Sequence, residues 1–452
     1  MLDLRDCPSL QHGALQDILE DINNGKLMKT YALLLLFVCL LLTLPVHSQQ
    51  KTDTSHLKLG GEVRFQYFNY RNEAWGEIPT NKDGFILSRY LLHMDADIRK
   101  NIRGFVQLQS SMASNRMDPS PVDENLLDLH QAYLDIRLTP GRQDFAFRIG
   151  RQELSYGSQR LISVREIPNN RQSFDAARLQ YTYGKLHAEG FYGYYVAARK
   201  GTFNDRLLNP QNKLWGIYTV WSDIKFLRNL DFYYFGLNKL STHYQGVQGE
   251  EDRHSIGGRI WHHSSNGGYD IEAVFQFGDF AGRRIRAWTL SSNTYLRLAK
   301  ITSSPTLGLK TEWISGDRNR NDSQINTFNA LYPKGAYFGL AALIGPYNLF
   351  DIHPYFSIKL GSKIEWQTDY DLFYRASKAD GIYEVNGSLI YDGNPRQSAF
   401  IGGQLGTSFD YKPTQKLLLR VESTWFDSGA FLKAVGPGKD ILMFGTTVQY
   451  KF

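Results

Sequence analysis

Six arginines and three acidic residues crowd the segment 148–179, RIGRQELSYGSQRLISVREIPNNRQSFDAARL. A guanidinium group is permanently charged, and its planar fork binds a carboxylate through two parallel hydrogen bonds. The segment therefore predicts one of two roles. The arginines contact an anionic solute, with the acids weakening the field so that the solute can leave, or the ion pairs only brace a long loop and stiffen a wall. The arginines are Arg148, Arg151, Arg160, Arg165, Arg171 and Arg178, and the acids are Glu153, Glu166 and Asp175.

A second group with possible chemistry is Asp351 with His353, in the sequence DIHP. An Asp-x-His pair on one strand face could form a catalytic dyad or part of a metal site. The sequence places no serine nucleophile or third ligand beside it, so an ion pair at the end of a strand is the expected role. No phosphate-binding glycine loop, HExxH or G-x-S-x-G motif is present. We therefore expect no catalytic residue, no metal site and no cofactor.

The elements that position these side chains are strands. Windows of about ten residues with apolar side chains at every second position recur through 57–452. In 89–99, for example, Tyr90, Leu92 and Met94 alternate with His93 and Asp95. The pattern fits the outer strands of a soluble sandwich. It also fits a barrel whose apolar face meets lipid and whose charged face meets water.

Connection lengths separate the two architectures. We predict strands near 57–70, 86–99, 102–113, 128–139, 143–152, 173–183, 185–198, 213–222, 228–240, 253–263, 268–279, 284–299, 305–315, 350–360, 362–377, 398–411, 415–427 and 440–452. Long connections, such as 153–172 and 316–349, mostly alternate with short ones, such as 100–101. Long extracellular loops and short periplasmic turns produce this parity, whereas a sandwich does not. The fold class is therefore all-β, a transmembrane antiparallel β-barrel of about 18 strands, with 316–349 either folded inward or capping the barrel.

The segment Ile441–Phe452 (ILMFGTTVQYKF) is an alternating strand that stops on an aromatic residue. Such a strand is typical of the closing strand of an outer-membrane barrel, where the aromatic ring lies at the membrane interface. We expect it to pair with the first strand, near 57–70.

The N-terminal region predicts export. A basic start at Lys29, an apolar core and small residues before position 49 describe a signal peptide at 28–48. Residues 1–27 are interpreted as a mis-assigned start or a disordered extension, 49–56 as a short periplasmic lead, and 57–452 as the barrel. Cys7 and Cys39 both precede the expected mature chain, which excludes disulfides and cysteine chemistry there.

The net charge of +6 indicates basic surface facing lipopolysaccharide or a basic lumen that attracts anions, and an exported chain meets no nucleic acid. Strand alternation and the arginine-rich segment assign arginines to the lumen. The predicted pore-lining residues are Arg64, Arg89, Arg151, Arg178, Arg259, Arg375 and Arg420, and the predicted supporting ion-pair residues are Glu153, Asp175, Asp351 and His353.

Three stretches carry a family resemblance: 148–179, YNLFDIHP at 347–354 and DLFYRASKADGIY at 371–383. Together they resemble the alginate export porin family of outer-membrane proteins, over most of the mature chain. The resemblance implies an 18-stranded barrel with an arginine-rich, electropositive pore for an anionic polysaccharide.

The expected function is thus a passive channel, or an export route, for an anionic solute in a Gram-negative outer membrane. Expected partners are outer-membrane lipid and lipopolysaccharide, the anionic solute, and periplasmic export or uptake components. The alternatives are a barrel enzyme of the lipase or protease type and a porin for unrelated small nutrients, because a fold does not fix what a pore selects.

Overall fold

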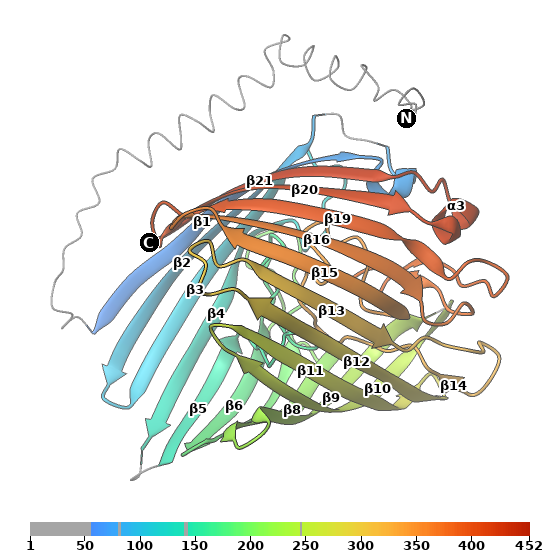
Figure 1. Ribbon diagram of the computed structural model, residues 1–452. Coiled ribbons are helices and arrows are strands. Elements are labelled where there is room, and N and C mark those ends of the chain that lie inside the picture. Colours follow the sequence, from blue (N-terminus) through green and yellow to red (C-terminus); the bar gives the residue numbers. More distant parts are fainter. Residues whose placement is uncertain (1–55, 80–82, 140–142, 245) are drawn as a thin grey trace. The chain divides into compact units, whose positions relative to one another are not determined.

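The computed structural model describes residues 56–79, 83–139, 143–244 and 246–452, which form one closed β-barrel (Figure 1). The predicted signal peptide at 28–48, the segment 1–27 and nearly all of the periplasmic lead at 49–56 lie outside the described residues. Among the described residues, no helix is both long enough and apolar enough to cross a membrane.

The barrel wall has 18 strands, because the 19-stranded sheet contains the two-residue strand β14 in addition to the wall. The wall strands are β1 (Leu57–Arg71), β2 (Phe85–Arg99), β3 (Ile102–Ser114), β4 (Asn125–Leu138), β5 (Gln143–Gln152), β6 (Phe174–Tyr183), β7 (Leu186–Tyr195), β8 (Asn212–Ile224), β9 (Arg228–Tyr244), β10 (Val247–His263), β11 (Gly267–Phe280), β12 (Arg283–Arg297), β13 (Thr306–Ile314), β15 (Leu349–Lys359), β16 (Ile364–Arg375), β19 (Phe400–Tyr411), β20 (Leu417–Ser428) and β21 (Ile441–Lys451). The smaller elements are η1 (Glu73–Gly76), β14 (Gln324–Ile325), β17 (Ile382–Tyr383), β18 (Leu389–Tyr391) and α3 (Ala430–Val435). The predicted all-β barrel is confirmed.

Strands β1 and β21 close the barrel as predicted. They pair antiparallel, with Val63 opposite Tyr450. Gly61 and Phe452 exchange two backbone hydrogen bonds, both 3.0 Å long. No sheet edge remains at this seam. A bilayer requires such closure, because lipid cannot form hydrogen bonds with free backbone groups.

One predicted connection is wrong. The strand prediction left 241–252 between the ninth and tenth strands, but β9 continues to Tyr244 and β10 begins at Val247. The run reads like a loop because both of its faces are polar: Glu251 is buried, whereas Glu250 and Asp252 are exposed. Glu251, which is fully buried, pairs with Lys239 across the ladder and accepts a hydrogen bond from Asn329 of a distant loop. The ladder with β9 and the lumen contact of Glu251 thus hold this part of the chain as strand.

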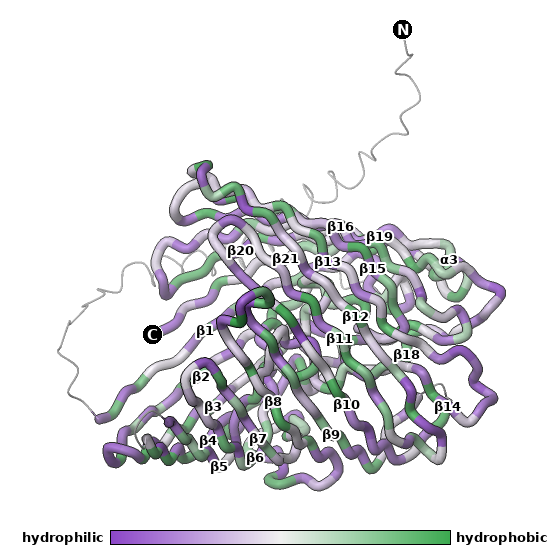
Figure 2. Tube along the Cα trace, turned by 60° about the horizontal axis from the view of Figure 1, so that its bottom comes forward, coloured by the Kyte–Doolittle hydropathy of each residue, from purple (hydrophilic) through white to green (hydrophobic). Residues whose placement is uncertain are grey.

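Hydrophilic and hydrophobic residues alternate along many of the wall strands (Figure 2), and the two kinds lie on opposite faces of the wall. Leu59, Phe232 and Trp313 point outward and are 72%, 58% and 52% exposed. Inward-facing Arg64 and Glu312 are buried, because two loops fill much of the lumen. This is the inverted polarity expected of a membrane barrel.

The crossbar loop (153–173, between β5 and β6) and the plug loop (315–348, between β13 and β15) fold inward and pair with each other. The Ser163 amide donates to the Tyr332 carbonyl at 3.0 Å, and the Tyr332 amide donates to the Leu161 carbonyl at 2.8 Å. Ile162 and Leu331 belong to the apolar core beside this contact. The core of the molecule therefore lies inside the barrel, and the long connection at 316–349 is an inward loop, one of the two alternatives left open by the sequence.

Candidate functional site

One end of the crossbar loop is fixed to β1 and β2. The Arg64 guanidinium donates to the carbonyls of Glu166 (3.0 Å) and Pro168 (2.9 Å). Arg89 donates to the same two carbonyls, and its Nη2 lies 2.8 Å from the Glu166 carboxylate and 2.6 Å from that of Glu62. Burial by itself would raise the pKa of Glu166, but Arg89 and Arg171 hold it below its usual value. Arg64 and Arg89 thus hold the crossbar loop across the lumen.

The other end of the crossbar loop contacts the opposite wall of the barrel, and there the loop contributes the positive charge, from Arg160. Arg160 Nε lies 3.0 Å from Glu312 Oε1 on β13 and 3.8 Å from Glu272 Oε2 on β11. Ser158 also donates to Glu272, at 2.5 Å. The loop is therefore anchored by an arginine where the wall is acidic and by an acid where the wall is basic. This arrangement satisfies charges that would otherwise be buried alone.

The plug loop spans the remaining lumen. At its start, the Thr327 carbonyl accepts a hydrogen bond from Arg253 on β10 at 3.2 Å. Further on, the Phe338 carbonyl accepts one from Gln404 on β19 at 2.8 Å. Ala341 then enters a small apolar cluster with Phe68, Phe85, Leu87 and Met443, from β1, β2 and β21.

Two cavities flank the plug loop and meet at Leu340, which lines both. The external cavity, about 400 Å³, is bordered by Tyr70 at the outer end of β1 and by Arg116 and Arg165. The periplasmic cavity, about 450 Å³, has a polar lining. Its lining includes one histidine, His263, and four charged residues, Arg297, Lys310, Asp369 and Glu422. Leu340 is therefore a residue of the plug loop that borders both cavities.

The remaining predicted pore-lining arginines are held by partners in the wall or its loops. Arg151 Nε lies 2.8 Å from Asp175, Arg178 Nη1 3.6 Å from Glu189, and Arg420 Nε 2.6 Å from Asp410. Arg259 pairs with Asp231 at 2.8 Å and Asp270 at 2.7 Å. Arg375 donates to backbone carbonyls of the connection between β16 and β19, including Ser398 at 2.7 Å. None of the seven borders either cavity, so a solute contact for them stays a prediction.

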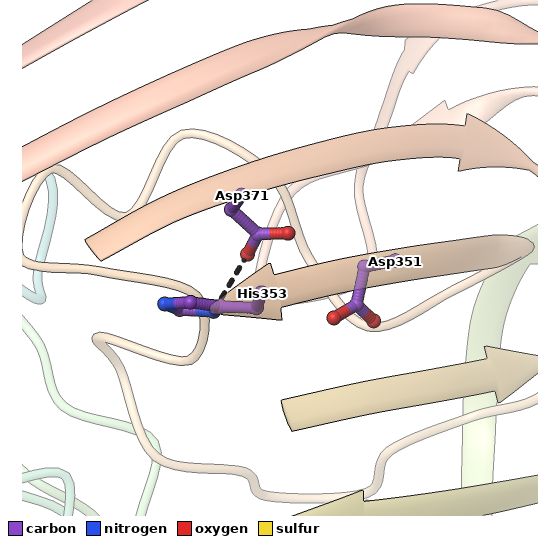
Figure 3. A group of neighbouring side chains, drawn as sticks. All are labelled: Asp351, His353 and Asp371. Carbon is purple, nitrogen blue, oxygen red and sulfur yellow. Dashed lines mark ion pairs between the residues drawn. The ribbon is translucent and has the colours of Figure 1, made fainter. Parts of the chain in front are cut away.

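The predicted supporting residues are found in charged clusters. Glu153 lies 2.8 Å from His130 Nε2 and 3.0 Å from Arg171 Nε. Asp351 and His353 lie beside Asp371 on the neighbouring strand β16 (Figure 3). His353 Nδ1 is 2.9 Å from Asp371 and its Nε2 is 2.7 Å from Asp369. The sequence did not place this third residue, because strand register cannot be read from alternation alone.

Lys310 and Leu340 are functional candidates that the sequence did not single out. Lys310 could have been found by alternation, because it lies two residues before inward-facing Glu312. No sequence pattern could have indicated Leu340, since an irregular loop has no periodicity that assigns one of its faces to a cavity.

The profile of the alginate export family matches residues 55–440. The chain belongs to the alginate export family. This confirms the resemblance seen in its sequence motifs, and it places the protein in the outer membrane of a Gram-negative bacterium. No curated protein has a sequence that matches this chain.

Solved structures share the fold of this alginate export family member. OccK2 (OpdF) of Pseudomonas aeruginosa, in complex with glucuronate, superposes with a TM-score of 0.58 at 9% identity, covering 88% of this chain and 98% of that one. OpdK of the same organism, with vanillate, gives 0.57 at 10% identity, with the same coverage. OccK11 (OpdR), also from that organism, gives 0.54 at 11% identity and covers 88% and 96%.

Proposed function

We propose that this protein is an outer-membrane channel for passive diffusion or export of an anionic, carboxylate-bearing solute of the uronate type. The observation that carries the proposal is a pair of cations in the periplasmic cavity, whose lining also holds the acids Asp369 and Glu422. Arg297 and Lys310 line it; Arg297 donates to the Thr306 hydroxyl, Lys310 lies over the Tyr355 ring, and neither forms an ion pair with a carboxylate among the described residues. Of the lining acids, Asp369 is bound to His353 at 2.7 Å. The cavity thus offers cations that a carboxylate can approach.

The comparisons support this chemistry. Vanillate and glucuronate, named in the OpdK and OccK2 structures, are both carboxylates, and the alginate of the family name is a polymer of uronates. A cavity of about 450 Å³ fits a sugar-sized solute. Passage of a long polymer would require the plug loop, which carries Leu340, to move aside.

Single-channel recording in planar bilayers tests the proposal. In a KCl gradient we expect a reversal potential of anion-selective sign, with glucuronate or oligouronates reducing the current. Charge reversal of the lumen cations, Lys310→Glu or Arg297→Glu, should lower the chloride-to-potassium permeability ratio several-fold. Lys416→Glu, on a turn outside the cavities, is the matched control. Cation selectivity of the wild type, or no conductance, would refute the channel for anions.

The same recording separates this proposal from a porin for unrelated nutrients. Block by glucuronate at concentrations where neutral glucose has no effect supports the uronate class. Equal block by both sugars would favour a porin without charge selection.

A barrel enzyme of the lipase or protease type has less support. Both ring nitrogens of His353 face carboxylates, at 2.7 and 2.9 Å, so this ring has no position left for a serine hydroxyl. Hydrolysis of phospholipid or peptide by the refolded protein would favour the enzyme.

Lipopolysaccharide is the proposed lipid partner at the external rim. Arg286 and Arg318 border an outer crevice of about 370 Å³ together with Trp288 and Trp313. Arginines above interfacial tryptophans suit phosphate groups of the outer leaflet. Periplasmic partners are expected at the short turns of the opposite end.

A further inference from the structure

We propose that Asp351, His353 and Asp371 form a binding site for one divalent transition-metal ion, with Zn²⁺ as the best probe. The site is independent of the proposed channel function. It lies on the inner wall of the barrel, where Asp351 and His353 of β15 face Asp371 of β16 (Figure 3). One imidazole and two carboxylates are a ligand set that zinc accepts, and imidazole favours such ions over Ca²⁺ or Mg²⁺.

The geometry suits a single ion. One ligand atom from each of the three side chains lies within 4.8 Å of the other two. Ligand atoms around one zinc ion, each about 2.0–2.2 Å from the metal, lie roughly 3–4 Å from one another. Rotation of the carboxylates closes the remaining difference. Three protein ligands leave a position for water.

His353 is oriented as a metal ligand. Its Nε2 lies 2.7 Å from Asp369 Oδ2, while Nδ1 points at Asp371, 2.9 Å away. A carboxylate on one ring nitrogen fixes the tautomer and leaves the other nitrogen free to coordinate. In the proposed site Nε2–H donates to Asp369, and Nδ1 is the ligand atom.

The buried carboxylates point to a missing cation. Asp351 and Asp371 are only 1% and 0% exposed. Asp351 Oδ1 and Asp371 Oδ1 are buried without a hydrogen-bond donor among the described residues. An ionised carboxylate in such a place is costly unless a positive charge compensates it. The single imidazole ring of His353 can carry at most one positive charge, which is too little to compensate the three carboxylates of Asp351, Asp369 and Asp371.

The nearby protein cations are directed elsewhere. Lys310 lies opposite His353 in the sheet, but its ammonium lies 5.1 Å from the centre of the Tyr355 ring, farther along the strand. Arg160 is engaged by Glu312 at 3.0 Å. Among the described residues, Asp351 forms no ion pair with either cation, which leaves its charge for a metal.

The site also has a route from solution. Asp369, which contacts His353, lines the periplasmic cavity, and its side chain is 27% exposed. A hydrated ion that reaches this cavity is therefore one side chain away from the three ligands.

The test is metal binding by the full chain, refolded in detergent and stripped with a chelator. Titration with Zn²⁺, followed by elemental analysis after gel filtration, should give one equivalent per chain. Asp351→Asn and Asp371→Asn should each weaken binding at least tenfold, and Asp369→Asn about 10- to 100-fold, as for other groups that orient a ligand. X-ray absorption should detect one nitrogen and oxygen ligands.

His263→Gln is the matched control, because His263 lines the same cavity and bonds Tyr295 at 3.1 Å rather than a carboxylate. This variant should bind Zn²⁺ like the wild type. Heat-dependent gel mobility checks that each variant has formed its barrel. The proposal is overturned if the folded wild type binds Zn²⁺ no more tightly than the folded Asp351→Asn/Asp371→Asn double variant, or if Ca²⁺ or Mg²⁺ binds more tightly than Zn²⁺.

Discussion

Arg160 and Glu166 lie six residues apart in one loop, yet their side chains bind opposite walls of the barrel: Arg160 pairs with Glu312 of β13 at 3.0 Å, and Glu166 with Arg89 of β2 at 2.8 Å. The crossbar loop is thus fixed at both ends by charge-assisted contacts. Releasing either end should open the lumen.

Arg64→Ala removes two guanidinium hydrogen bonds to the crossbar loop. Hydrogen bonds from charged donors contribute about 1.5–3 kcal/mol each, so the loop should detach from β1 part of the time. We expect a larger and noisier single-channel conductance. Arg420→Ala is the control, since Arg420 pairs with Asp410 in the wall at 2.6 Å and does not contact the loop. Equal conductance in both variants would contradict a constricting loop.

Leu340 should control the size of the passage, because it borders both cavities. Leu340→Ala is expected to raise the conductance and Leu340→Trp to lower it by at least half. Leu343→Ala, in the same loop, is the control because Leu343 lines only the external cavity. The idea fails if the alanine and tryptophan variants change the conductance in the same direction.

Lys334 of the plug loop should make stability depend on pH. Burial, together with the nearby positive charges of Arg160 and Lys310, lowers the pKa of its ammonium from 10.5 to about 8. The folded chain then releases this proton near pH 8, whereas the unfolded chain keeps it up to about 10.5. Since the unfolded state binds more protons in this window, the contribution of Lys334 to stability improves as pH rises from 8 to 10.5.

Thermal unfolding of the wild type and of Lys334→Gln measures this effect. At pH 7 the variant should unfold at the higher temperature, because it carries no buried charge, and the difference should shrink towards pH 10. A difference that stays constant with pH would show that Lys334 does not titrate in this range.

The seam between β1 and β21 depends on a glycine. A Cβ on Gly61 would meet the ring of Phe452 at 2.6 Å and the carbonyl of Leu91. Overpacking of this kind costs about 1–3 kcal/mol, so Gly61→Val should lower the unfolding temperature and the refolding yield. Gly190→Val is the control, because a Cβ at Gly190 has its nearest neighbour 4.0 Å away. If both variants lose unfolding temperature and refolding yield to a similar extent, the seam is no more sensitive to an added side chain than the rest of the wall.

The wall could be predicted from sequence because each strand carries its own signal. Inward Arg89 and outward Tyr90 follow from a period of two, whatever the rest of the chain does. What fills the lumen could not be predicted in this way. The bond from Arg64 to the Pro168 carbonyl joins residues 104 positions apart, and no local pattern encodes such a contact. Alternation thus identified a lumen-facing arginine without revealing that a loop occupies its donors.

Asp371 illustrates the same limit at a smaller scale. Its strand and its inward direction follow from alternation, but its proximity to His353 depends on the register between β15 and β16, which a shift of one residue would change. The prediction for the polar end of β10 was wrong for a related reason. Glu251 resembles a loop residue unless its distant partner Asn329 is known.

The crossbar loop also orders the assembly of the barrel. It follows β5, but the acids that receive Arg160 belong to β11 and β13. During insertion these acids cannot receive it until the later strands have joined the wall. We therefore expect the crossbar loop to reach its final position only as the wall nears completion.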